Sequence, residues 1–267
     1  GDVDRWIAGS NFDNRTDTNH PKYMPLWVII ELAKIAYVTL EDLQSSVISY
    51  RSGGSGNIIL NPKLPIKITP EFESVIFHLF GDGHVGNGTP SYFQKDRTSN
   101  KQFLSKLKNC FGDFNENVPE EFCIRFPKAI SDIFTYYYDI NSYHSSKIRI
   151  PTEIYNAPKF SKLACILAFI LDEGNIRDVV NIVSMNREFL ADLKKLMESC
   201  GYICKEIKPH GSSNTFYLNM ANCSIEIFYQ DYVKLIKQFP TCSLANKHDK
   251  LVYIISRREN KSKIQEL

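Results

Sequence analysis

The chain has 267 residues, of which 43% are hydrophobic and 23% are charged, and its formal net charge is +2. This composition is typical of a folded globular protein and excludes a disordered or fibrous chain. No apolar run approaches the ~20 residues that a membrane-spanning helix needs, so we expect no membrane association. Because acidic and basic residues nearly balance, nucleic-acid binding requires the basic side chains to gather on one face.

The seven cysteines contain no CxxC pair of the kind found in zinc sites. An odd number of thiols without that spacing favours reduced, mostly buried cysteines in a cytoplasmic protein. The chain begins at Gly1 without a signal-peptide pattern, which is compatible with a segment of a longer protein.

The first part of the chain predicts a small helical module after a linker. Residues 1–21 are polar and loop-like. Residues 25–36 begin with proline and carry an apolar stripe, which predicts a helix. Thr39 and Asp42 form a capping-box-like start to a second helix over residues 40–50, and a glycine-rich turn and an extended stretch follow. This module either touches DNA or only packs against the rest of the chain.

Two apolar stretches, VIFHLFGDG and ILAFILDEG, end in Asp82 and Glu173, and glycine follows each acid at once. The apolar run predicts a buried helix, and glycine lets the chain turn sharply where the helix stops. If the two helix ends lie side by side, their carboxylates form a ready site for a divalent metal ion, which prefers oxygen ligands.

From residue 71 the chain repeats itself. The segment NKQFLSKLK at residues 100–108 matches NREFLADLK at residues 186–194, an offset of 86 residues. The acid–glycine motifs are 91 residues apart (173 − 82), and FCIRF and FYLNM are 94 residues apart (216 − 122). Similar offsets in the same order indicate a duplication.

The pattern of each copy predicts a helix, two short strands, an amphipathic helix, a hairpin and a final helix, in this order. We therefore predict an α+β fold that contains the order αββαββα twice. The predicted domains are an accessory module over residues 1–70, a first repeat over residues 71–160 and a second repeat over residues 161–267.

With these two motifs and this repeated order, the chain resembles the LAGLIDADG homing endonucleases in their single-chain, two-motif form. The resemblance covers residues 71–255, and residues 22–70 resemble the segment that precedes this domain in standalone archaeal members. It implies that the motif helices pack in parallel at a pseudo-twofold axis of a monomer. It also implies that each repeat offers an antiparallel sheet to the major groove of double-stranded DNA.

The resemblance further implies a sequence-specific endonuclease that makes double-strand cuts. Asp82 and Glu173 would bind Mg²⁺ or Mn²⁺ beside the scissile phosphates, and the backbone carbonyls of Gly81 and Asp172 would join the metal shell. Elementary chemistry agrees, because phosphodiester hydrolysis needs an activated water and neutralised phosphoryl charge, and metal ions on carboxylates supply both.

The family also places a basic residue near each acid, and Lys147 and Lys247 fall in the corresponding regions as candidate catalytic residues. They could position the attacking water or simply contact phosphate. Side chains that can read base edges or hold phosphates lie on or beside predicted strands, and they contact either DNA or solvent. These candidates are Gln94, Lys95, Arg97, Arg125, Lys205, Lys208 and Asn219.

The first motif departs from the family pattern, which has a small residue near the middle of the first helix. Phe77 stands there, and Ala168 stands opposite in the second motif. We expect the bulky ring to widen or tilt the helix crossing. This departure keeps a second function open, that of a non-cleaving DNA- or RNA-binding regulator or intron-splicing factor.

Overall fold

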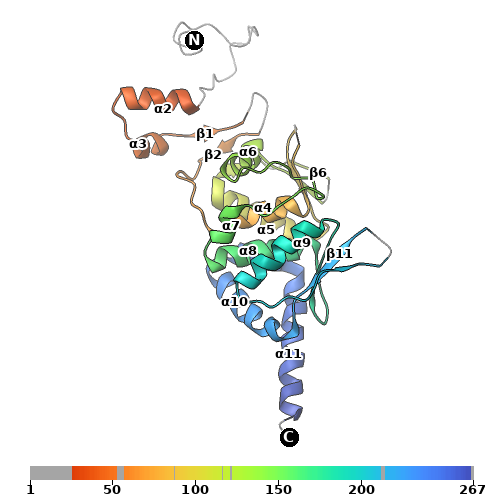
Figure 1. Cartoon of the computed structure of the whole chain (residues 1–267). Helices are drawn as coiled ribbons and strands as arrows, with labels where there is room; N and C mark the ends of the chain where they lie inside the picture. Colours follow the sequence, from red (N-terminus) through yellow and green to blue (C-terminus); the bar gives the residue numbers. More distant parts are fainter. Residues whose placement is uncertain are drawn as a thin grey trace. The chain divides into compact units, whose positions relative to one another are not determined.

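The structure is a computed structural model, and it describes residues 26–52, 57–86, 88–115, 117–120, 122–211 and 214–265 (Figure 1). The linker predicted over residues 1–21 lies outside the described residues, as does most of the glycine-rich turn. The chain divides into two compact units, residues 1–47 and residues 48–267, and each is described by itself.

The described part of the smaller unit consists of two helices, α2 (Leu26–Ile35) and α3 (Leu40–Ser45). The side chain of Thr39 caps α3 by accepting a hydrogen bond from the Asp42 amide at 3.1 Å, which confirms the predicted helix start. The helix ends earlier than predicted because β-branched residues follow it in the sequence VISY, and these favour extended backbone.

Part of the segment predicted as an accessory module joins the larger unit. Strands β1 (Ser49–Tyr50) and β2 (Ile59–Leu60) form a three-stranded antiparallel sheet with β5 (Asp113–Phe114), in the order β1-β2-β5. Gly112 precedes β5 with φ +116°, and a Cβ there would lie 2.7 Å from the Asn61 carbonyl oxygen. The glycine thus permits this close pairing.

The larger unit contains the order αββαββα twice, which confirms the predicted fold class. The first copy consists of α4 (Pro70–Phe80), β3 (Gly83–His84), β4 (Ser91–Phe93), α5 (Arg97–Phe111), β6 (Asn117–Glu120), β7 (Cys123–Arg125) and α6 (Lys128–Tyr137). The second copy consists of α8 (Lys159–Glu173), β8 (Gly174–Ile176), β9 (Val180–Ser184), α9 (Arg187–Ser199), β10 (Lys208–Pro209), β11 (Phe216–Asn219) and α10 (Ile225–Gln238).

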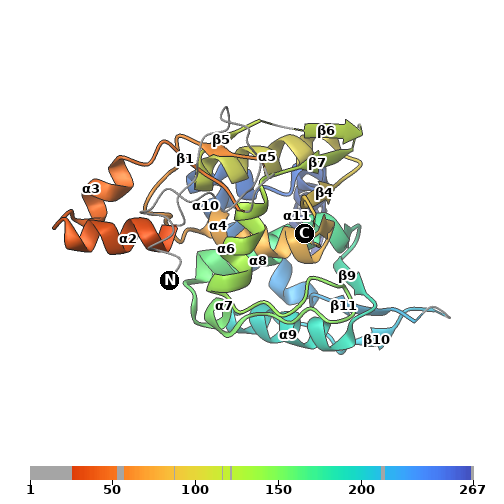
Figure 2. The ribbon, with the colours of Figure 1, turned by 90° about the horizontal axis from the view of Figure 1, so that it is seen from above.

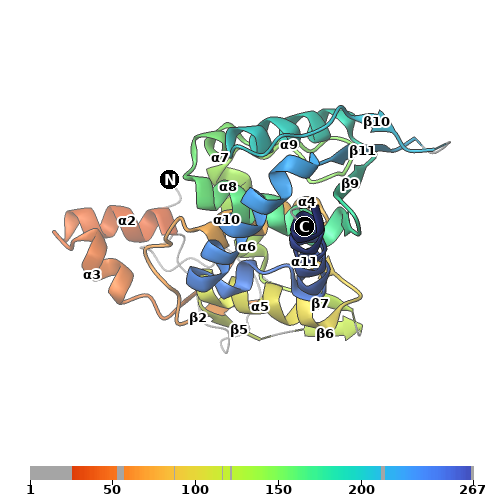
Figure 3. The same cartoon turned by 90° about the horizontal axis from the view of Figure 1, so that it is seen from below.

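Each copy carries a four-stranded antiparallel sheet, ordered β3-β4-β7-β6 in the first and β8-β9-β11-β10 in the second. The registers correspond, because Gly83 pairs with Tyr92 and Gly174 with Ile182. Figures 2 and 3 show the two sheets on opposite sides of the central helices, each with its own amphipathic helix, α5 or α9.

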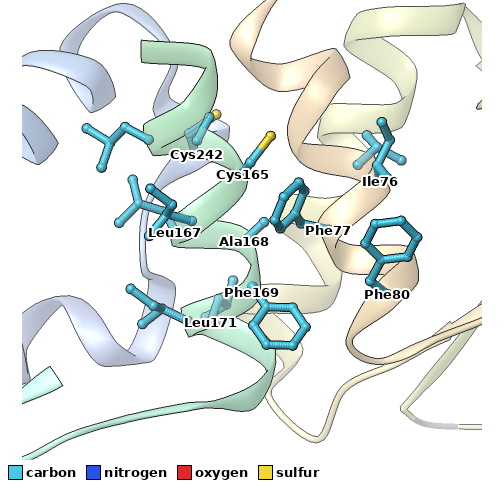
Figure 4. Close-up of a cluster of buried hydrophobic side chains, with 14 of the residues drawn as sticks. Ile76, Phe77, Phe80, Cys165, Leu167, Ala168, Phe169, Leu171 and Cys242 are labelled. Atoms are coloured by element: carbon cyan, nitrogen blue, oxygen red, sulfur yellow. The ribbon is translucent and has the colours of Figure 1, made fainter. Parts of the chain in front are cut away.

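The two motif helices α4 and α8 pack in parallel. Near their starts Glu73 is hydrogen bonded to the Ser161 side chain, and near their ends a Cβ at Gly81 would lie 2.7 Å from the Asp172 Cβ. Phe77 is fully buried, and its ring fills the space beside Ala168 (Figure 4). The first motif thus places a small residue, Gly81, against α8 at the helix end, whereas the middle of the helix has Phe77.

Helices α5 and α9 correspond in a register one turn away from the sequence match. Asp96 caps α5 and Asn186 caps α9, each by accepting from the amide three residues later, so the caps are 90 residues apart (186 − 96). At this offset every buried apolar residue of α9 matches a buried residue of α5, as Cys200 matches Cys110. A four-residue slip leaves a helical apolar pattern almost unchanged, so the motif match at 86 residues was wrong by one turn.

Further elements link and follow the repeats, namely α7 (Thr152–Asn156), three short 3₁₀ turns, η1 (Asn222–Ser224), η2 (Pro240–Cys242) and η3 (Ala245–Lys247), and α11 (His248–Gln265). Among the described residues, no helix is both long enough and apolar enough to cross a bilayer. All seven cysteines are free, and five of them are buried. Cys223 is exposed.

Candidate acid site at the ends of the two central helices

Two glycines turn the chain directly from each motif helix into its first strand. A Cβ at Gly83 would lie 2.5 Å from the Leu79 Cα, and a Cβ at Gly174 would lie 2.5 Å from the Ile170 carbonyl oxygen. Each strand thus starts against the last turn of its own helix, where only glycine fits. As a result, the preceding acids, Asp82 and Glu173, occupy equivalent places at the two helix ends.

Asp82 is half-buried and held by its neighbours. The Gln94 amide nitrogen donates to its Oδ2 at 2.7 Å. Burial, followed by the negative charges of Asp172 and Glu173, raises the pKa of Asp82 to about 7, and the positive charge of Lys247 opposes this shift. A carboxylate in such surroundings lacks compensating positive charge.

Glu173 occupies the equivalent place at the end of α8 and is more exposed than Asp82. The residue is exposed, and partial burial of its carboxylate together with the charge of Asp172 raises its pKa. Lys247 lowers that pKa, so one ammonium group acts on both acid ends.

Lys247 is attached to the end of α8. Its Nζ donates to the carbonyl oxygens of Ile170, Leu171 and Gly174 at 3.0, 2.5 and 2.7 Å. The last carbonyls of a helix have no partner within the helix, and an ammonium group there also opposes the negative end of the helix dipole. Burial lowers the pKa of Lys247, while the three nearby carboxylates raise it.

The side-chain carboxylate of Asp172 is hydrogen bonded to residues of the first repeat. Its side chain has no exposed surface, Tyr92 donates to its Oδ1 at 2.7 Å, and the His78 Nδ1 lies 3.0 Å from its Oδ2. The backbone amide of Asp82 also bonds to this carboxylate. Burial nevertheless raises the pKa of Asp172 to about 7. The predicted metal contact at this residue is its backbone carbonyl, and the side chain has a different set of partners.

The donor set suits a hard divalent cation. Asp82 and Glu173 supply carboxylate oxygens from the two helix ends, and burial, followed by the neighbouring negative charges, raises the pKa of both. Among the described residues, no three His, Cys, Asp or Glu side chains form a complete metal cage. Mg²⁺ commonly binds one or two carboxylates and takes its other ligands from water and substrate phosphates.

Lys147 has different surroundings from Lys247, the other predicted lysine. It is exposed on a turn, where its backbone amide donates to the His144 carbonyl at 2.7 Å. Lys147 is not among the charges that shift the pKa of Asp82 or Glu173, whereas Lys247 acts on both. The structure therefore brings one of the two predicted lysines to the acids.

Gln94 belongs to the acid site through its bond to Asp82, and the other six predicted DNA-contacting residues lie elsewhere on the repeats. Lys95 follows β4 and Arg97 is the first residue of α5, and both are exposed. Lys205 is exposed, and its backbone amide donates to the Asn219 carbonyl at 2.8 Å. Lys208 is exposed on β10.

Arg125 and Asn219 occupy equivalent positions on the open faces of the two sheets. Arg125 pairs with Ser91 on β4, and Asn219 pairs with Asn181 on β9. Asn181 donates its side-chain amide to the Asn219 Oδ1 at 2.6 Å. The first face thus presents a cation where the second presents a pair of amides.

Three residues of the site were not predicted: His78, Tyr92 and Lys106. Lys106 is 1% exposed, and its Nζ lies 2.8 Å from the His78 Nε2. The sequence carries a weak signal for each polar residue, because His78 interrupts an apolar run and Lys106 falls on the apolar face of its helix. The connection from Lys106 through His78 to Asp172 cannot be inferred from that signal.

No family model and no curated protein matches the chain. Among solved structures, mesophilic variants of the homing endonuclease I-DmoI are 13% identical, with a TM-score of 0.43, and the match covers 61% of this chain and 94% of that one. I-DmoI in complex with DNA and Mn is 12% identical, with a TM-score of 0.41 and coverage of 63% and 94%.

Full-length DUF199/WhiA from Thermatoga maritima is 10% identical, with a TM-score of 0.44 and coverage of 76% of this chain and 68% of that one. Likenesses this distant carry no information about activity.

Proposed function

We propose that the chain is a sequence-specific DNA endonuclease of the LAGLIDADG type that cuts both strands by divalent-metal-dependent hydrolysis. The observation that carries the proposal is the pair of acids, Asp82 and Glu173, at the ends of two parallel central helices between two open-faced sheets. Two acids, one from each repeat, suit one cut on each strand.

Asp82 and Glu173 would hold Mg²⁺ or Mn²⁺, with the backbone carbonyls of Gly81 and Asp172 as further ligands. When bound, the metal supplies charge neutralisation at the phosphoryl group and an activated water. Gln94 orients the Asp82 carboxylate through its 2.7 Å hydrogen bond. Lys247 fixes the end of α8 and lowers the negative charge felt at both acids.

The open sheet faces are the proposed DNA-binding surface. Arg125, Lys208 and Asn219 lie on strands of these faces, and Lys95, Arg97 and Lys205 lie beside strands. Arginine pairs bidentately with guanine and asparagine with adenine, whereas lysine also holds phosphates as a point charge. The differing residues at the equivalent positions Arg125 and Asn219 favour two unequal half-sites.

The test is cleavage of a genomic DNA library in the presence of Mg²⁺, with sequencing of the cut ends. Reproducible wild-type cuts that disappear in the Asp82→Asn/Glu173→Gln double variant are expected. Each single variant should lose cleavage of one strand by about 10³-fold, because several kcal/mol of metal stabilisation are lost and 1.4 kcal/mol is a tenfold change. Binding of the target at low salt should persist in all variants.

A non-cleaving DNA- or RNA-binding regulator or splicing factor is the second candidate. It is favoured by the hydrogen bonding of Lys247, whose three donors all go to backbone carbonyls. An ammonium group has only three donors, so Lys247 in this state has none left for a water. Salt-sensitive binding without cuts, in the wild type and in the acid variants alike, would select this candidate over the endonuclease.

A further inference from the structure

The two acid ends differ at the residue before each acid. Gly83 and Gly174 contact their own helices in the same way, so Gly81 in the first repeat corresponds to Asp172 in the second. Asp172 is therefore an additional carboxylate that has no counterpart at the other end.

The side chain of Asp172 crosses from the second repeat into the first. A Cβ at Gly81 would lie 2.7 Å from the Asp172 Cβ and 2.9 Å from its Oδ2, so the missing side chain of Gly81 leaves the space that Asp172 fills. There the carboxylate meets Tyr92 and His78 of the first repeat and the backbone amide of Asp82.

A buried lysine completes this network behind His78. The ammonium group of Lys106 can only donate, so the His78 Nε2, 2.8 Å away, accepts. His78 is then neutral with its proton on Nδ1, which donates to Asp172. Burial and the charge of Lys106 hold the pKa of His78 well below its usual range, in agreement with a neutral ring.

The second repeat has apolar residues at all three corresponding positions. Phe169 corresponds to His78, Ile182 to Tyr92 and Leu196 to Lys106, by the matched helix ends, strand registers and helix caps. All three are buried. Polar groups in a core cost free energy unless they are satisfied. Here the carboxylate that enters from the other repeat pairs with His78 and Tyr92, and His78 pairs in turn with Lys106.

We infer that Asp172 is a positioning residue for Asp82: it belongs functionally to the first repeat, and it holds the turn that leads into Asp82 by packing against Gly81 and interacting with the Asp82 amide. His78, Tyr92 and Lys106 hold Asp172 in the orientation that this requires. The Glu173 end has no equivalent device. This inference rests on the proposed function only where it concerns cutting, since the contact between Asp172 and the Asp82 amide is a property of the protein without DNA.

The experiment has a spectroscopic arm and a cleavage arm. In protein labelled with ¹⁵N-aspartate, the Asp82 amide resonance is assigned by its loss in Asp82→Asn. An amide bonded to a carboxylate is expected at low field in the wild type. It should move upfield in Asp172→Ala, move less in Asp172→Asn, which keeps an acceptor oxygen, and stay unchanged in Glu173→Gln.

In the cleavage arm each strand of a target duplex carries its own label, and Asp82→Asn identifies the strand that depends on Asp82. Asp172→Ala and His78→Phe should slow that strand by about 10²-fold, the effect of a small misplacement, and should slow the other strand much less. Nicked duplex should therefore accumulate, and Asp172→Asn should restore part of the lost rate.

The outcomes separate the inference from the proposed function. If the wild type makes no cuts, the endonuclease proposal fails and the Asp82 resonance alone decides the inference. An unchanged Asp82 amide in folded Asp172→Ala overturns it, as does equal slowing of both strands in Asp172→Ala and His78→Phe. If Asp172→Ala does not fold, the same readings are taken on Asp172→Asn and His78→Phe.

Discussion

The ends of the two motif helices, α4 and α8, follow a similar backbone path, but the side chains that surround them differ in polarity. Gly83 and Gly174 make similar close contacts with the preceding helix turn, although α4 ends at Phe80 and α8 continues to Glu173. Beneath these contacts, one core holds His78, Tyr92 and Lys106, and the other holds only apolar residues at these places. The duplicated backbone therefore sets the position of each acid, whereas the neighbouring side chains determine its interactions.

Charge divides between the two ends in a complementary way. The first end has a buried lysine, Lys106, that reaches the carboxylate of Asp172 through His78. The second end has Lys247, which binds the terminal carbonyls of α8 directly. Lys106 thus acts at the first end through side chains, whereas Lys247 binds the backbone of α8 and its charge acts on both acids.

The largest expected effect tests the shared backbone. Gly174→Ala should lower the free energy of unfolding by about 3 kcal/mol, because its Cβ would lie 2.5 Å from a backbone oxygen that cannot move cheaply. Gly83→Ala should cost a similar amount. Gly88→Ala is the control, since nothing lies within 4 Å of its added Cβ. Urea denaturation measures all three, and tolerance at one end only would show that the two turns are not equivalent.

A smaller effect tests the unequal cores. Lys106→Met should cost about 2 kcal/mol of folding stability, because it leaves the buried His78 Nε2 without its donor. Leu196→Met at the corresponding position is the matched control and should cost less than about 1.5 kcal/mol, since it conserves volume in an apolar site. Equal losses in urea denaturation would mean that the polar network adds nothing to stability.

The smallest expected effect is the pH dependence of stability, measured with a chelator present. Asp82 and Asp172 have folded-state pKa values of about 7, above their unfolded values, so the folded protein binds more protons between about pH 4 and 7. Their contribution to stability is therefore greatest at low pH and is lost as pH rises towards 8. We expect Asp82→Asn to raise Tm at pH 8 by about 2–4 °C, the shift for 1 kcal/mol in a domain of this size, with little change at pH 5.

Glu173→Gln is the control for this measurement, because the exposed Glu173 should change Tm less. Adding Mg²⁺ at pH 8 should raise the wild-type Tm if the folded acids bind it, and this rise should shrink in Asp82→Asn. A flat Tm profile from pH 5 to 8 would contradict the crowding of the carboxylates.

The sequence by itself determined the local features of this protein. The acid–glycine ends, the repeated αββαββα order and the Thr39 cap depend on residues close together in the chain, where helical and strand periodicity and glycine's freedom decide the outcome. The two lysine candidates came from the family resemblance instead, and of these the charge of Lys247 acts on both acids whereas that of Lys147 is not among the charges that shift their pKa values.

Only the tertiary structure decided the side-chain partners and the register. The matching apolar pattern of α5 and α9 allows a slip of one turn, and only the helix caps and the buried positions remove it. His78 and Asp172 are 94 residues apart and 3.0 Å distant, a contact that depends on the packing of α4 against α8. The acid motifs were visible in the sequence as two equal ends, and the packing made them unequal, because Asp172 fills the space that Gly81 leaves.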